Sequence, residues 1–215
     1  MEIKKIIDLS VTVYTYMPAG SMSPLTELKP IGILPREGYS YETLFSGTHT
    51  GTHVDAPYHF SESGLTIDRL DLRSMIGEGY CIEVIPKGKE ITRAELESKW
   101  SSEFDGKILL LNTGWSKRRG FTKEFFYDYP GLSSDTCDFL LAHRVNTVGI
   151  DSLGIEPQGR TEVHKILLEK GLVFVEDMTN LESLEKGKKY FIIILPVKLL
   201  NAGGAMARAV ALDVF

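Results

Sequence analysis

The stretch "TVGIDSLGIEPQGRTEVHKILLEKGLVFV", residues 147–175, contains the pattern that decides the fold class. It begins with a short apolar run at 147–150 and continues through a polar loop that contains glycine and proline. A helix is expected from Thr161, and Gly171 should end it because glycine readily adopts the left-handed conformation found there. A second apolar run follows at 172–175. This order of strand, helix and strand predicts an α/β fold.

The rest of the chain extends the same pattern. Further strands are predicted at 3–15, 80–85, 107–111, 190–195 and 207–214, where apolar runs end in Gly, Pro, Asp or Asn. A capping box formed by Thr92 and Glu95 predicts a helix that runs to about Trp100, and another helix is expected over 138–143. The first half is mostly extended and looped. We therefore expect a mixed β-sheet core with flanking helices, built as one domain over residues 1–215.

Composition excludes several classes of function. The net charge is −5, and no basic run is longer than "SKRRG" at 116–120, which argues against a nucleic-acid-binding protein. No stretch of about 18 apolar residues could span a membrane, and "MEIKKIIDLS" reaches an aspartate before any long apolar run, which is unlike a signal peptide. Cys81 and Cys137 have no metal-type spacing, so we expect two free thiols and a cytoplasmic setting.

The segment "THTGTHVDAPYHF", residues 48–60, holds three of the five histidines together with Asp55. In a strand, His49 and His53 would lie about 13 Å apart, too far for neighbouring ligands of one ion. A helix would pair these two histidines but turn Asp55 away. We therefore predict a tight turn at 49–53 followed by an extended exit, and a metal site at that turn. His59 is expected to stand near the metal as a proton carrier, since the ordinary pKa of histidine lies near neutrality.

The stretch "HTGTHVDAPYH", residues 49–59, resembles the H-x-G-T-H-x-D-x-P-x-H motif of the cyclase-like metal-dependent hydrolase family, which includes bacterial kynurenine formamidase and isatin hydrolase. Four further segments are similar to segments of that family: "LNTGW" at 111–115, "YPGLS" at 129–133, "VGIDSLGIE" at 148–156 and "LPVKLLNAGGAMARAVAL" at 195–212. The resemblance implies a swivelling β/β/α-like fold. It also implies a homo-oligomer, either a dimer or a tetramer.

The resemblance also implies a ligand set. His49, His53 and Asp55 would hold one divalent ion, Zn²⁺ or Mn²⁺, and His59 would be the general acid/base. A second ion would be held by His164 and Glu176, with Asp55 bridging the two.

The implied activity is hydrolysis of a small amide, either an aryl formamide or a cyclic amide, by metal-activated water. In family members that act on kynurenine-type compounds, a Trp-Pro-Gly-Asp-like loop occupies the place of "TYMPAG", residues 15–20, from which Met17 and Ala19 depart. Tyr14 and Tyr16 are candidates for an aromatic wall, and Arg208 for a contact with a substrate carboxylate. Two other functions stay open: a cyclase or lyase that polarises a carbonyl, and a metal-binding protein without turnover.

Overall fold

The computed structural model describes residues 2–20 and 23–215. Its centre is a mixed sheet, in which one group of neighbouring strands is parallel and the other pairs are antiparallel. In spatial order the strands are β1 (Lys5–Asp8), β12 (Gly204–Asp213), β11 (Tyr190–Pro196), β5 (Ile76–Glu83), β7 (Ile108–Asn112), β9 (Thr147–Ile150), β10 (Val173–Glu176) and β4 (His53–Asp55). Strands β5, β7, β9 and β10 run parallel to one another, and the other pairings are antiparallel.

A second pairing of β4 closes the sheet. Besides β10, β4 also pairs with the first residues of β12, so that Gly204 lies opposite Asp55. Seven strands therefore form a barrel, and β1 is an additional strand that pairs with the last residues of β12. The predicted mixed α/β architecture is confirmed, whereas the swivelling β/β/α-like arrangement stays a prediction.

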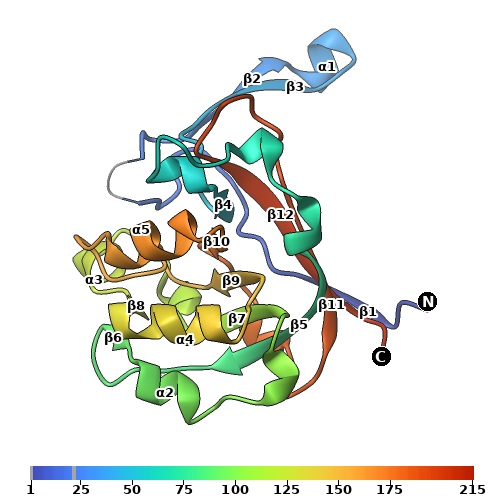
Figure 1. Ribbon diagram of the computed structural model, residues 1–215. Coiled ribbons are helices and arrows are strands. Elements are labelled where there is room, and N and C mark those ends of the chain that lie inside the picture. Colours follow the sequence, from blue (N-terminus) through green and yellow to red (C-terminus); the bar gives the residue numbers. More distant parts are fainter. Residues whose placement is uncertain (1, 21–22) are drawn as a thin grey trace.

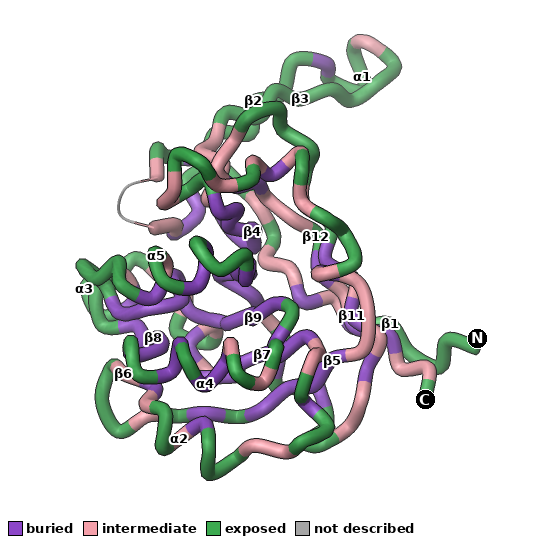
Figure 2. The backbone as a smooth tube through the Cα atoms, in the orientation of Figure 1, coloured by how far each residue is buried: buried purple, intermediate pink, exposed green. Residues whose placement is uncertain are grey.

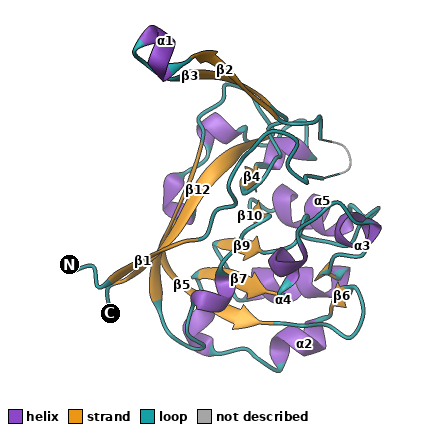
Figure 3. Ribbon diagram, turned by 180° about the vertical axis from the view of Figure 1, so that it is seen from behind, coloured by secondary structure: helices purple, strands orange, loops and turns teal. Residues whose placement is uncertain are grey.

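Two apolar layers hold the barrel and its helices together. In β7, Ile108 and Leu110 point to the barrel interior, and Leu109 and Leu111 point to the outer layer. A strand that is covered on both faces has a continuous run of apolar residues, which explains the "ILLL" sequence of β7. The outer layer is covered by helices, as Figures 1 and 3 show. The described residues form the α-helices α2 (Arg93–Glu97), α3 (Lys123–Tyr127), α4 (Cys137–Ala142) and α5 (Glu162–Glu169) in the body of the protein, and α1 (Leu34–Glu37) away from it.

The local predictions hold where the pattern was regular. The capping box of Thr92 and Glu95 is present at the start of α2, although that helix ends at Glu97. Helix α5 starts after Thr161, and Gly171 has a φ of 82°, as its terminating role requires. The strand predicted at 3–15 is shorter than expected, because only Lys5–Asp8 finds a full partner in β12.

Two small sheets lie outside the barrel. Strands β6 (Glu90–Ile91) and β8 (Gly131–Leu132) pair in parallel. Strands β2 (Glu27–Gly32) and β3 (Tyr41–Phe45) form an antiparallel hairpin that projects from the body of the protein, and Figure 2 shows it as almost wholly exposed. Within the described ranges, no helix is long and apolar enough to cross a bilayer.

Candidate metal centre

The histidine-rich segment forms the turn and extended exit that its sequence predicts. Residues 48–52 bend, and Gly51 has a φ of 62°, which few residues other than glycine adopt easily. The Thr52 hydroxyl fixes this turn, since it donates to the carbonyl of Asp177 and accepts from the backbone N–H of Val11. Strand β4 then places His53 and Asp55 on the outer face of the barrel and Val54 in the interior.

Neighbouring elements bring the other predicted residues to the same place. Glu176, at the end of β10, lies directly opposite His53 in the strand register. His164 projects from α5, and His59 ends the short 3₁₀ helix η1 (Pro57–His59). All six side chains predicted from the sequence therefore converge on one point.

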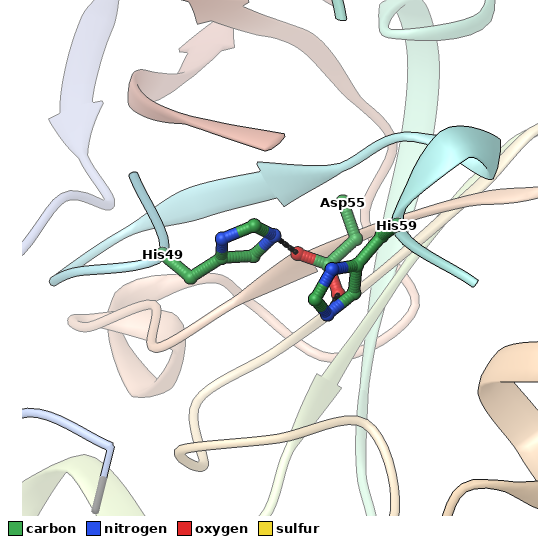
Figure 4. A group of neighbouring side chains, drawn as sticks. All are labelled: His49, Asp55 and His59. Atoms are coloured by element: carbon green, nitrogen blue, oxygen red, sulfur yellow. Dashed lines mark ion pairs between the residues drawn. The ribbon is translucent and has the colours of Figure 1, made fainter. Parts of the chain in front are cut away.

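The Asp55 carboxylate is at the centre of this cluster. Its Oδ1 lies 3.3 Å from Nε2 of His49 and 3.4 Å from Nε2 of His53. Its Oδ2 lies 3.6 Å from Nε2 of His164 and 3.9 Å from Nε2 of His59. Figure 4 shows the rings of His49 and His59 at the Asp55 carboxylate, with a dashed line for the ion pair between His49 and Asp55.

Glu176 completes the cluster on the side of β10. Its Oε2 lies 3.4 Å from Nε2 of His53, and its Oε1 lies 3.3 Å from Nε2 of His164. The backbone N–H of Ile155 also donates to Oε1 at 2.6 Å, which holds the carboxylate in place.

Three histidine rings point Nε2 at Asp55, and each of them is held in place by a hydrogen bond at Nδ1. Nδ1 of His53 donates to the carbonyl of Gly51 at 2.7 Å, and Nδ1 of His164 donates to Glu156 at 2.5 Å. Nδ1 of His49 is hydrogen-bonded to the hydroxyl of Thr48 at 2.9 Å. Holding one ring nitrogen in this way aims the other, and it is the usual support for a histidine that ligates a metal.

Two buried atoms test whether a cation fits this cluster. Nε2 of His49 and Oδ1 of Asp55 face each other, yet neither has a hydrogen-bond partner among the described residues. Buried polar atoms are normally paired, and a lone pair on each makes both atoms metal donors. In each of two sets of residues, the possible donor atoms all lie within 4.8 Å of one another. One set is His53, Asp55 and Glu176, and the other is His49, Asp55 and His59. The residues present therefore fit a divalent cation.

The charges of the buried carboxylates also favour a cation at this position. Burial lowers the pKa of His53, but its contacts with Glu176 and Asp55 outweigh burial and raise this pKa to about 9. Burial also opposes the charge of His164, and contacts with Glu156 and Glu176 raise its pKa to about 10. Burial, together with the positive charge of His53, lowers the pKa of His49 to about 3. The buried carboxylates thus attract positive charge to this cluster.

A cavity of about 500 Å³ opens above the cluster. The loop after β9 lines it with Leu153, Gly154 and Glu156, and the loop after β7 holds the β9 loop in place. There, Thr113 donates its N–H and its hydroxyl to Asp151.

Two expectations about the substrate wall are wrong. The described lining of the cavity includes Tyr129 but neither Tyr14 nor Tyr16, which are 44% and 51% exposed. Arg208 forms an ion pair with Asp8 on the surface instead of facing the cavity.

Glu156 is a site residue that sequence reasoning missed. It is 2% exposed, and it also accepts from the backbone N–H groups of Val163 and His164. Gly131 makes this position possible, because a Cβ there would lie 2.4 Å from Cα of Glu156. Since Glu156 lies eight residues before His164 across a loop, no regular spacing could have shown the pair.

Comparison with known proteins identifies the family. The model of the family described as "Putative cyclase" matches residues 7–157. The chain belongs to this family. It is 33% identical over 170 residues to kynurenine formamidase of Bacillus cereus, covering 78% of this chain and 77% of that protein. It is 30% identical over 177 residues to Cyclase-like protein 2 of Arabidopsis thaliana, covering 77% of this chain and 62% of the relative. The match thus spans less than two thirds of the plant protein.

Solved structures share the whole architecture. A potential metal-dependent hydrolase with cyclase activity superimposes with a TM-score of 0.81 at 27% identity, and 98% of each chain is covered. An isatin hydrolase bound to the product analogue thioisatinate gives a TM-score of 0.86 at 22% identity, with 98% of this chain and 93% of that chain covered. At 22% identity, the similarity to the isatin hydrolase shows a shared fold and nothing more.

Proposed function

We propose that this protein is a metal-dependent hydrolase of small amides, either aryl formamides or cyclic amides. The observation that carries the proposal is the convergence of four imidazoles and two carboxylates at the floor of one cavity. Kynurenine formamidase among the similar proteins supports the same class of reaction.

The residues fit one or two ions, Zn²⁺ or Mn²⁺. His49, His53 and Asp55 would hold the first ion, and His164 and Glu176 would hold a second that shares Asp55. Histidine suits zinc, and a carboxylate-rich position also accepts manganese. When bound, such a cation supplies hydroxide at neutral pH and polarises the substrate carbonyl.

His59 is suited to move the proton. Its ring stacks on that of His49, with centroids 4.2 Å apart, and its side chain is 34% exposed at the cavity. Burial lowers its pKa, which favours the neutral imidazole over the charged one. A neutral imidazole beside the reacting atoms can accept a proton from water and give it to the departing nitrogen.

The cavity sets the size of the substrate. A volume of about 500 Å³ lies within the range typical of small-molecule sites. Phe60, Tyr129 and Leu153 give it apolar walls next to the polar floor. We therefore expect a compact amide with an aromatic or cyclic part.

Metal analysis combined with a substrate panel tests the proposal. The purified chain should contain one or two equivalents of divalent metal, and Asp55→Ala should lose it. The loaded protein should hydrolyse at least one of formanilide, N-formylkynurenine, isatin and a small lactam. In H₂¹⁸O the product carboxylate or formate should gain one ¹⁸O atom, which a cyclase or lyase would not produce. Full metal retention by Asp55→Ala would refute the ligand set, and a loaded protein inert to the whole panel would refute the substrate class.

A further inference from the structure

One wall of the cavity carries a cation that the proposed hydrolysis does not use. Residues 158–161, at the end of the loop that joins β9 to α5, all line the cavity. Arg160 is the one lysine or arginine among the described residues of this lining. Small-molecule sites use a few placed polar or charged groups to fix the orientation of the ligand. Arg160 is therefore a candidate for recognising a charged part of the substrate.

Two hydrogen bonds hold this wall in place. The backbone N–H of Arg160 donates to the carbonyl of Pro157, which closes a turn, and Gly159 within the turn has a φ of 84°. The hydroxyl of Tyr129 donates to Oε1 of Gln158 at 3.0 Å, which joins the wall to the segment before β8. The side chain of Arg160 therefore starts from a defined turn.

The guanidinium group of Arg160 is held on one side by an acid. Its Nη1 forms an ion pair with Oε1 of Glu90 on β6, and Glu90 lies opposite Gly131 of β8 in the strand register. The side chain of Arg160 is nevertheless 53% exposed. A guanidinium carries five N–H donors. The contact with Glu90 engages Nη1, so the donors on Nε and Nη2 remain for an anion.

Arg160 is close enough to the metal centre for one small molecule to reach both. His164 follows it by four residues, and Nε2 of His164 faces Asp55 and Glu176. A chain extends by at most about 3.6 Å per residue, so the two Cα atoms are at most about 14 Å apart. Both residues line the same cavity of about 500 Å³.

We propose that Arg160 binds a carboxylate of the substrate, and that the preferred substrate is an anionic aryl amide whose acid group lies away from the amide. This inference rests on the proposed hydrolase function and names its substrate class. The amide would lie at the floor beside the metal ligands, and the carboxylate would lie at the wall. Nε and Nη2 form the fork that binds a carboxylate through two parallel hydrogen bonds, which adds geometric specificity to affinity.

The acids of the cavity favour a singly charged anion over a zwitterion. The four carboxylates of the described lining are already engaged: Asp55 and Glu176 as proposed metal ligands, Glu156 with His164, and Asp177 with Arg119. An ammonium group on the substrate would therefore find no unengaged acid among them. Its removal from water would then cost affinity.

Three formanilides of similar size test the proposal. They are para-formamidophenylpropanoate, its methyl ester, and para-formamidophenylalanine, which adds an ammonium group to the propanoate. The metal-loaded wild-type chain should favour the propanoate over the ester in kcat/KM by about 10–100-fold, the usual contribution of a hydrogen bond to a charged group. Arg160→Gln should bring this ratio close to one, and Arg160→Lys should keep part of it. The amino acid should be no better a substrate than the propanoate.

Lys165→Gln is the matched control. It removes one positive charge from α5 at an exposed position outside the described lining of the cavity, so it should leave the ratio unchanged. A preference for the propanoate that survives Arg160→Gln would overturn the proposal. Equal losses for the propanoate and the ester in that variant would also overturn it, because they would indicate a structural role. A clear preference for the amino acid would refute the singly charged class.

A binding measurement separates this inference from the proposed function. Titration calorimetry on metal-loaded His59→Asn, in which turnover should be slow, gives the Kd of the propanoate and of the ester. The propanoate should bind about 10–100-fold more tightly, and the double variant His59→Asn, Arg160→Gln should lose this difference. Arg160-dependent binding without hydrolysis by the wild-type chain would refute the proposed function alone. Hydrolysis with no preference that depends on Arg160 would refute this inference alone.

Discussion

Glu156 accepts a hydrogen bond from Nδ1 of His164 at 2.5 Å and thereby points Nε2 of that ring at Asp55 and Glu176. The same carboxylate accepts from the backbone N–H groups of Val163 and His164, in the first turn of α5. One buried acid thus fixes both the helix and the ring that the helix presents to the cluster.

Replacing this acid should weaken metal binding without unfolding the protein. Glu156→Gln keeps one of the two acceptor oxygens that the helix N–H groups use, and it removes the charge that raises the basicity of His164. Loss of such a supporting carboxylate typically lowers metal affinity by about 10–100-fold. Competition with a chelator measures the change. Glu162→Gln, on the exposed first turn of the same helix, is the control and should bind metal as the wild type does.

Gly204 should be irreplaceable at the closure of the barrel. A Cβ at this position would lie 2.4 Å from Nε2 of His49 and 2.7 Å from the carbonyl oxygen of Val54. Gly204→Ala should therefore destabilise the protein by about 1–3 kcal/mol and displace His49 from the cluster. Chemical denaturation and metal content measure the two effects. Gly88→Ala is the matched control because its Cβ would meet nothing within 4 Å, and an equal loss there would contradict the steric explanation.

Gly204 lies in a part of the fold that could not be predicted from the sequence. The turn at 49–53, helix α5 and the strands that flank this helix could be predicted because each depends on neighbouring residues. The closure of the barrel could not, since β4 and the start of β12 lie about 150 residues apart and share no local pattern. Glu156 was missed for the same reason, because a loop brings it to His164. His164 and Glu176 were found only through resemblance to a family.

Arg119 should stabilise the fold by neutralising a buried acid. Burial raises the pKa of Asp177, and the ion pair with Arg119 opposes that shift. Arg119→Ala would leave this carboxylate unpaired, a change that typically costs about 3–5 kcal/mol at a buried site. Denaturant unfolding measures the loss. Arg118→Ala removes the neighbouring arginine from an exposed pair with Glu124 and should cost at most about 1 kcal/mol. Similar losses in the two variants would show that burial of the pair is unimportant.

Both thiols should be inert in the folded protein. Burial raises the pKa of Cys81 to about 12, with a smaller contribution from Asp151. Burial, and then Glu156, raises the pKa of Cys137 to about 12 as well. At pH 8 only about one thiol in ten thousand is the reactive thiolate. A disulfide reagent should therefore label neither cysteine in the native protein and two per chain in guanidinium. Fast labelling of the native chain would contradict the buried positions.

His59 should be needed for turnover but not for metal binding. If its imidazole carries the proton to the leaving group, His59→Asn should lower kcat by about 10²–10⁴-fold, the usual contribution of such a transfer. Metal content should stay at the wild-type level, because His49, His53, Asp55, His164 and Glu176 remain. His143→Asn is the matched control, since His143 lies at the end of α4 and contacts Asp105 outside the cavity. Loss of metal from His59→Asn would instead make His59 a ligand, in keeping with its place beside His49 and Asp55 in one of the two donor sets.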